Sequence, residues 1–304
     1  MNLLSQSHKK LLFRRSSQIL LLLILLMTVG TVFDLQIAEF VGAAYRGFWY
    51  FAFGVTFEVL GFLPAILVNA CLFATLGAYA KTQPIKILFH VLCAKALLGA
   101  VFCAVFWTMA NHSVDVRTSI SVPISLTVGA VLSFPFMKFF RRFDEMALKR
   151  LIYLLTIGLV MGTLANLATG VLQVFWGRYR FFEVTENSLP FTQWFQPFGR
   201  SEAAQGHGAT SFPSLHASSV ASMIILPLAS MALEVKASTK KRLTILAVVM
   251  IVAVSLSRMI LRWHYLTDVT FSLIIATIAF IMAVLIIDGA FGAKFQKFIN
   301  NRGE

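Results

Sequence analysis

The chain has 304 residues, of which 58% are hydrophobic and only 13% are charged, and its mean hydropathy is +0.80. This composition lies far outside that of soluble domains, so the sequence predicts an integral membrane protein. We attribute the net charge of +13 to membrane topology and expect no nucleic-acid partner.

Apolar windows of about 20 residues are long enough to cross a bilayer as helices. The chain contains eight such windows, which lie near residues 17–33, 60–79, 86–109, 120–139, 151–175, 214–233, 243–261 and 267–287. The predicted fold class is therefore all-α, a polytopic transmembrane helix bundle. The first window could also be read as a signal peptide, but Asp34 and Glu39 follow it closely and favour a retained helix.

Lysine and arginine collect in cytoplasmic loops of membrane proteins. With the N-terminus in the cytoplasm, alternate loops and the tail at 290–304 hold most of the 26 basic residues. The outside loops should be poor in arginine, yet they contain one cluster of arginines. Such a cluster needs an explanation, such as bound phosphate. Its members are Arg178, Arg180, Arg200, Arg258 and Arg262. We expect a bacterial inner-membrane protein whose functional site faces the periplasm or exterior.

The one long polar segment, 177–211, joins the fifth and sixth predicted helices on the outside face. Its many aromatic residues predict a folded lid at the membrane interface. The short turn at 258–267 lies on the same side by alternation. Polar residues of both segments, and His216 at the start of the sixth helix, can therefore meet at one membrane face.

His264 and Asp268 are four residues apart, which on a helix places both side chains on one face. A carboxylate bonded to one imidazole nitrogen fixes the tautomer and leaves the other nitrogen as a nucleophile. Arg258 lies near the end of the preceding helix and can neutralise phosphate oxygens. These three residues predict a phosphoryl-transfer site.

A second histidine segment, Pro213-Ser214-Leu215-His216, begins the sixth predicted helix. Backbone N–H groups at a helix start favour an anion, and His216 is well placed to protonate a leaving oxygen. No group of His, Cys and carboxylate residues has the spacing of metal ligands, so we expect neither a metal site nor a cofactor. Glu58 and Lys95 are intramembrane ionisable residues and remain candidates by default.

These motifs resemble the type 2 phosphatidic acid phosphatase superfamily, whose motifs read Lys-x6-Arg-Pro, Pro-Ser-Gly-His and Ser-Arg-x5-His-x3-Asp. The third is matched in full by Ser257, Arg258, His264 and Asp268. The second is matched with Leu215 in place of glycine. The first is matched through Gly177-Arg178-Tyr179-Arg180, with Gln173 in place of the lysine and Phe181 in place of the proline.

The resemblance implies that 86–289 is a six-helix phosphatase core, preceded in 1–85 by a tail and two additional helices. It implies a phosphohistidine mechanism in which His264 attacks phosphorus, Asp268 orients it and His216 protonates the leaving group. The residues expected at the phosphate are Arg258, Arg180, Ser214, Arg178, Gln173 and Leu215. Leu215 keeps the backbone N–H of the replaced glycine, and Gln173 can donate a hydrogen bond in place of the lysine.

The expected function is hydrolysis of a phosphomonoester or diphosphate of a membrane lipid. Phosphatidate, phosphatidylglycerol phosphate, a polyprenyl diphosphate and lipid A all fit a site at headgroup depth, because motifs that bind phosphate do not report the tail. A lipid phosphotransferase, or a non-catalytic lipid-binding or transport relative, is the alternative. A transporter should show repeated halves and broken helices, and the sequence shows neither.

Overall fold

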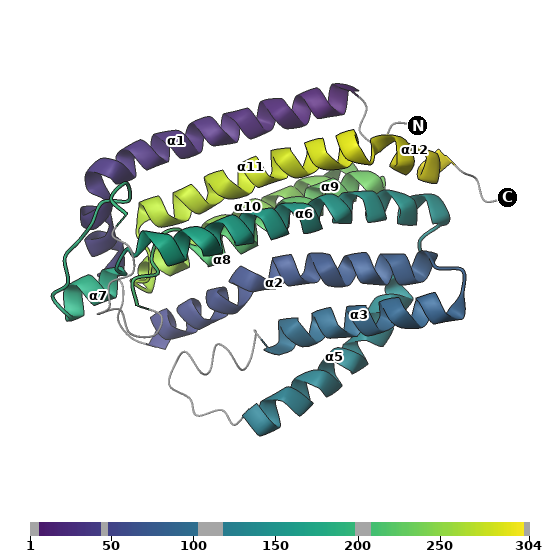
Figure 1. Ribbon diagram of the computed structural model, residues 1–304, viewed down its shortest axis with the longest axis horizontal. Coiled ribbons are helices and arrows are strands. Elements are labelled where there is room, and N and C mark those ends of the chain that lie inside the picture. The colour runs from purple at the N-terminus through teal and green to yellow at the C-terminus, as the bar shows by residue number, and fades with distance from the viewer. Residues whose placement is uncertain (1–5, 44–47, 103–117, 198–207, 301–304) are drawn as a thin grey trace.

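The computed structural model describes residues 6–43, 48–102, 118–197 and 208–300. All regular structure in these ranges is helical, which confirms the all-α prediction. Long helices run side by side in a bundle (Figure 1). The elements are α1 (Gln6–Gly42), α2 (Phe48–Tyr79), α3 (Gln83–Val101), α5 (Thr118–Phe140), α6 (Glu145–Trp176), α7 (Phe181–Glu186), α8 (Leu215–Val220), the 3-10 helix η2 (Ala221–Ile224), α9 (Ile225–Ala232), α10 (Ala237–Ile260), α11 (Leu266–Ala290) and α12 (Gly292–Asn300).

Within these ranges, six helices are long and apolar enough to cross a membrane: α1, α2, α3, α6, α10 and α11. The other two predicted spans correspond to shorter apolar helices, which are Thr127–Phe140 in α5 and Leu215–Met231 across α8, η2 and α9. The protein is therefore an integral, multi-pass membrane protein. Its hydrophobic outer faces, such as Leu21 and Leu25 on α1, suit contact with lipid tails.

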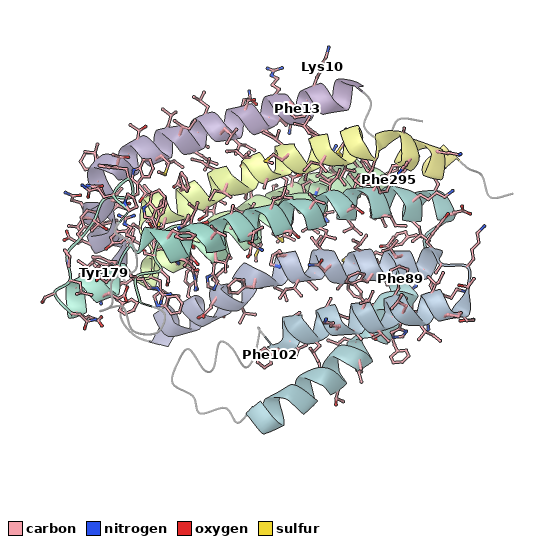
Figure 2. The ribbon with its side chains drawn as sticks, viewed as in Figure 1. Lys10, Phe13, Phe89, Phe102, Tyr179 and Phe295 are labelled. Atoms are coloured by element: carbon pink, nitrogen blue, oxygen red, sulfur yellow. The ribbon has the colours of Figure 1, made fainter. Side chains whose placement is uncertain are left out.

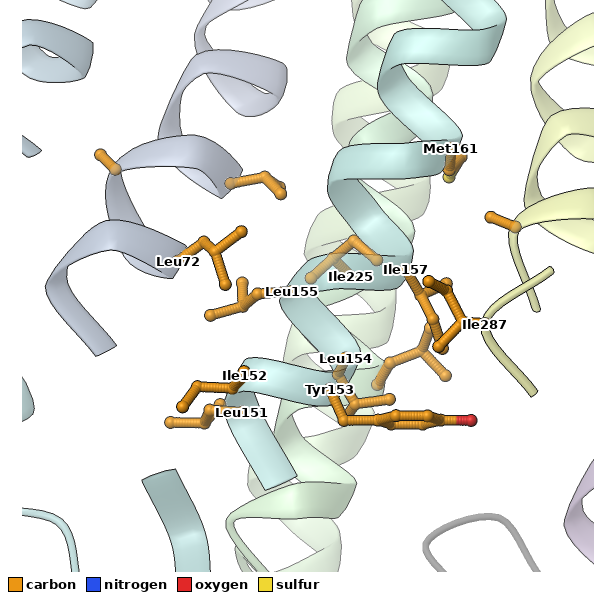
Figure 3. Packing of buried hydrophobic residues seen from close by; sticks show 14 of the residues in the cluster. Leu72, Leu151, Ile152, Tyr153, Leu154, Leu155, Ile157, Met161, Ile225 and Ile287 are labelled. Atoms are coloured by element: carbon orange, nitrogen blue, oxygen red, sulfur yellow. The ribbon is translucent and has the colours of Figure 1, made fainter. Parts of the chain in front are cut away.

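Helix α6 lies at the centre of the bundle and packs against α2, α8, α9 and α11. Figure 3 shows Ile157 and Met161 of α6 on the side of α11, with Leu155 on the side of Leu72 from α2. Gly158 allows α9 to approach closely, because a Cβ there would lie 2.8 Å from Ile225. This packed centre holds the ends of α6, α8, α10 and α11 in fixed positions relative to one another.

The first two helices, which we expect to precede the phosphatase core at 86–289, both contact helices of that region. Helix α1 packs along α11 and also contacts α10, and α2 packs against α6, α8 and α10. Helices α3 and α5 form a hairpin that contacts α2 and lies at the lower edge of Figure 1. The first two helices thus pack against helices that carry the predicted site, whereas the hairpin of α3 and α5 packs mainly against α2.

The turns at one end of the bundle gather the predicted site residues. Helix α6 ends at Gly177, whose left-handed backbone (φ 71°) turns the chain into α7 at no steric cost. Helix α11 begins beside Tyr265, whose backbone N–H donates to the Asp268 carboxylate at 2.8 Å. Figure 2 labels Tyr179 at this end, among side chains that carry nitrogen and oxygen atoms.

The described part of the long loop folds over this end. Trp176 donates from its indole to the Trp194 carbonyl at 2.6 Å, and Trp194 donates to the Thr31 hydroxyl of α1 at 2.8 Å. The Trp194 ring also packs against Phe212 and Phe271. Residues 198–207 of the predicted lid, including Arg200, lie outside the described residues.

Candidate active site

His264 lies in the turn between α10 and α11 and is buried. Its Nδ1 lies 2.6 Å from the backbone carbonyl oxygen of Ser211, which can only accept a hydrogen bond. Nδ1 therefore carries a proton, and in the neutral ring Nε2 is the nitrogen that keeps its lone pair. Burial lowers the pKa of His264 below its usual range, and the neighbouring Asp268 opposes this shift. Burial thus favours the neutral imidazole, and the bond to Ser211 makes Nε2 the nitrogen that can act as a nucleophile.

Asp268 acts on His264 less directly than expected. The sequence suggests a carboxylate bonded to the imidazole, but Asp268 Oδ2 lies 3.7 Å from His264 Nδ1. The Ser211 hydroxyl donates to the same oxygen at 2.5 Å, while the Ser211 carbonyl accepts from Nδ1. Asp268 therefore stabilises an imidazolium through space and positions Ser211, which holds the ring.

His216 and Ser214 come from the start of α8. Both are buried, and neither His216 Nε2 nor Ser214 Oγ has a hydrogen-bond partner among the groups that the structure describes. His216 interacts electrostatically with His264, Arg180 and Arg258, so the four side chains share one site. A buried polar atom without a partner costs about 1–3 kcal/mol, which favours a ligand rich in hydrogen-bonding oxygens.

Arg180 and Arg258 are held by the same indole. The guanidinium carbons lie 4.9 Å and 5.6 Å from the Trp263 ring centroid, respectively. Arg180 donates from Nη2 to the Thr210 hydroxyl at 3.0 Å, and Arg258 donates from Nη2 to the Gly54 carbonyl at 3.0 Å. Two planar cations beside two histidines suit a phosphate group.

Arg178 is placed differently from the expectation that it binds phosphate. It lies between two carboxylates, with Nη2 2.8 Å from Asp34 Oδ2 and Nη1 2.6 Å from Asp268 Oδ1. Its Nε donates to the Thr192 carbonyl at 3.0 Å, and Nη1 also donates to the Thr267 hydroxyl. Arg178 is therefore an internal ion-pair partner, because both of its Nη atoms bond to carboxylates and its side chain is only 1% exposed.

Gln173 also binds protein groups. Its Nε2 donates to the Pro213 carbonyl at 2.6 Å and to the Thr210 carbonyl at 3.3 Å. These bonds support the segment before Ser214, and the contact of Gln173 with phosphate stays a prediction. Leu215, half-buried at the first position of α8, leaves the side chains of Ser214 and His216 buried beside it.

The model of the PAP2 superfamily matches residues 149–291, which run from α6 through α11. This region of the chain belongs to the PAP2 superfamily. Neither the curated proteins nor the solved structures contain a match to it. Membership and the apolar helices together support a membrane phosphatase. The match begins later than the expected core at residue 86, and it contains all of the predicted site residues.

Helix α2 lies outside the region that matches the PAP2 superfamily, yet it forms one wall of the site. A Cβ on Gly61 would lie 2.7 Å from His216 Cδ2, so glycine is what lets the helix approach. The Phe62 ring centroid lies 4.1 Å from that of His216. Glu58 is buried and interacts electrostatically with Arg180. Of these contacts, the sequence signalled only the intramembrane charge of Glu58.

Two further residues of this PAP2 site were missed by sequence reasoning. Trp263 lies inside the third motif at a position that the motif leaves open, so its type carried no signal. In the sequence, Asp34 serves only to favour a retained first helix over a signal peptide. An acidic residue so close to a predicted span was nevertheless a signal, because intramembrane carboxylates are expensive and usually paired.

Proposed function

We propose that this PAP2 protein is a lipid phosphate phosphatase that works through a phosphohistidine at His264. The observation that carries the proposal is the meeting of a neutral, oriented imidazole with a second histidine and two arginines at one end of the bundle. These groups supply a nucleophile, a proton donor and charge stabilisation, which are the three requirements of phosphoryl transfer.

In the first step, His264 Nε2 forms a bond to phosphorus while the bond from phosphorus to the lipid oxygen breaks. His216 gives its proton to that oxygen. The dianionic phosphate supplies the negative charge that stabilises a protonated His216 beside Arg180 and Arg258. In the second step, water attacks phosphorus, His216 takes the proton from the water, and the N–P bond breaks to release inorganic phosphate and regenerate both imidazoles.

The position of the site supports a lipid substrate. The site lies at the ends of α6, α10 and α11, three of the helices that are long enough to span a membrane. A phosphate bound there lies at headgroup depth, while the tail lies among apolar helices. Phosphatidate, phosphatidylglycerol phosphate, a polyprenyl diphosphate and lipid A all meet this requirement.

We propose that the site faces away from the cytoplasm. The turns at the opposite end of the bundle carry basic residues, among them Arg141 and Arg142 after α5 and Lys236 before α10. By the positive-inside rule, that end is cytoplasmic. A cysteine at exposed Asn187, after α7, should react with an impermeant thiol reagent in intact cells. Reaction only after lysis would overturn this orientation.

The proposal is tested by phosphate release from the four lipids, with purified full-length protein in detergent and EDTA present. Wild-type protein should release phosphate from at least one lipid, and His264→Ala should reduce release to background. His90→Ala is the matched control, because His90 lies on α3, bonds to Ser133 and lies outside the site. Release by His264→Ala, or release by wild type only after Mg²⁺ is restored, would contradict the mechanism.

A further inference from the structure

Asp34 joins the first helix to the catalytic turn. It lies on α1, outside the region that matches the superfamily, and is buried. Its Oδ2 accepts from Arg178 Nη2 at 2.8 Å and from the Thr267 hydroxyl, and its Oδ1 accepts from the Thr267 backbone N–H at 3.0 Å. A Cβ on Gly30 would lie 2.7 Å from the Thr267 methyl group, so glycine lets α1 approach this turn.

The contact to Thr267 places Asp34 at the start of α11. Thr267 is the second residue of this 25-residue helix, where backbone N–H groups lack partners within the helix. Asp34 supplies an acceptor and a negative charge there, as an N-cap residue does, but from another helix. Because Asp268 follows directly, the same contact fixes the first turn from which the carboxylate projects.

The contact between Asp34 and Arg178 determines how much of the guanidinium charge acts on Asp268. Arg178 bonds to Asp34 on one side and to Asp268 on the other, and its guanidinium carbon lies 4.1 Å from the Tyr265 ring centroid. One cation between two carboxylates leaves the group with a net negative charge. Without Asp34, the whole positive charge of Arg178 would act on Asp268. The negative potential that Asp268 produces at His264 would then be largely cancelled.

We propose that Asp34 is a positioning residue for the reaction at His264, acting through Arg178 and Asp268 without touching the substrate. The inference rests on the proposed function. The chain of contacts runs from Asp34 to Arg178, Asp268, Ser211 and His264, and every link is a hydrogen bond between buried groups. The first helix is therefore a working part of the catalytic site.

The expected effect of Asp34→Asn on His264 follows from the loss of one negative charge. Among the described residues, the charged or titratable groups that interact with the His264 imidazole include Asp268 on α11, Arg180 before α7 and His216 on α8. Asp34→Asn leaves all three in place but removes one negative charge behind Asp268. The pKa of His264 should therefore fall further, because its imidazolium loses electrostatic support. The transition state, which develops that imidazolium-like charge, should lose stabilisation as well.

The test compares wild type, Asp34→Asn and Glu39→Gln as full-length proteins. Glu39 is the matched control, because it lies on the same helix and is exposed. On the best lipid of the panel, Asp34→Asn should lower kcat at least tenfold with KM within twofold, and Glu39→Gln should match wild type. The His264 pKa, followed by NMR of ¹³C-labelled histidine and assigned by its loss in His264→Ala, should fall in Asp34→Asn alone.

If Asp34→Asn lowers only the unfolding temperature and leaves kcat and the His264 pKa at wild-type values, the residue is merely structural and the inference fails. If no lipid is hydrolysed by wild type but the pKa still falls, the proposed function fails and the link to His264 stands. If Asp34→Asn does not fold, the comparison is made instead between the single variant Arg178→Gln and the double variant Asp34→Asn/Arg178→Gln. Equal kcat in that pair supports action through Arg178, and a further tenfold loss in the double variant refutes it.

Discussion

Replacing Arg178 with glutamine tests whether this residue is an internal ion pair or a phosphate ligand. The substitution leaves Asp34 and Asp268 facing each other without a cation, and neither carboxylate side chain is exposed to solvent. Removing one partner of a buried ion pair destabilises a protein by about 3–5 kcal/mol. For a chain of this size, that corresponds to a fall of about 10 °C in the unfolding temperature.

The matched control is Arg262→Gln. Arg262 also forms an ion pair, at 2.8 Å with Glu186, but the Glu186 side chain is 57% exposed. A surface pair of this kind contributes about 0–1 kcal/mol. Thermal unfolding of both variants in the same detergent, at one scan rate, measures the difference. An unfolding temperature of Arg178→Gln equal to that of Arg262→Gln, combined with a large rise in KM, would refute the buried pair and restore Arg178 as a phosphate ligand.

Three further outcomes follow from the site. Asp268→Asn should fold but lower kcat by more than the tenfold expected of Asp34→Asn, because its carboxylate lies closer to His264. Near-normal kcat would show that Asp268 does not support His264. Burial lowers the pKa of His264, so the nucleophile stays neutral until the pH falls below that lowered pKa. On the acid side of the profile, kcat/KM should therefore reach half its maximum below about pH 6.5. A half-maximum above that pH would contradict the burial argument. Gln173→Lys should keep kcat/KM within tenfold of wild type, about 1.4 kcal/mol, because lysine can still donate to the Pro213 and Thr210 carbonyls. Gln173→Leu cannot donate and should lose more activity. A loss greater than tenfold in Gln173→Lys would refute this role.

The helices and the pair of His264 and Asp268 could be predicted because both depend on local spacing. Apolar windows report membrane spans through their length alone. The third motif places its histidine and carboxylate one helical turn apart. The wrong part of that prediction concerns the bond between them, because the acceptor for Nδ1 is the backbone carbonyl of Ser211. Every residue carries such a carbonyl, so its position has no signature in the sequence.

The role of Arg178 could not be predicted because it depends on packing between distant segments. Asp34 lies 144 positions before Arg178 and reaches it only because α1 packs along α11. The same holds for α2, which approaches His216 through Gly61. A single sequence does not distinguish an apolar helix that lines a site from an apolar helix that faces lipid. The hairpin of α3 and α5 could therefore not be distinguished from the helices of the bundle centre.

The most direct test of the central claim is to trap the phosphoenzyme. Wild-type protein would be mixed with a lipid from the panel carrying ³²P in its phosphate, denatured in alkali within milliseconds to seconds, and digested to locate the label. The mechanism predicts an acid-labile, alkali-stable phosphate on the peptide that contains His264, absent from His264→Ala and retained in His90→Ala. Label on another residue, or rapid phosphate release with no labelled protein at any time, would contradict it.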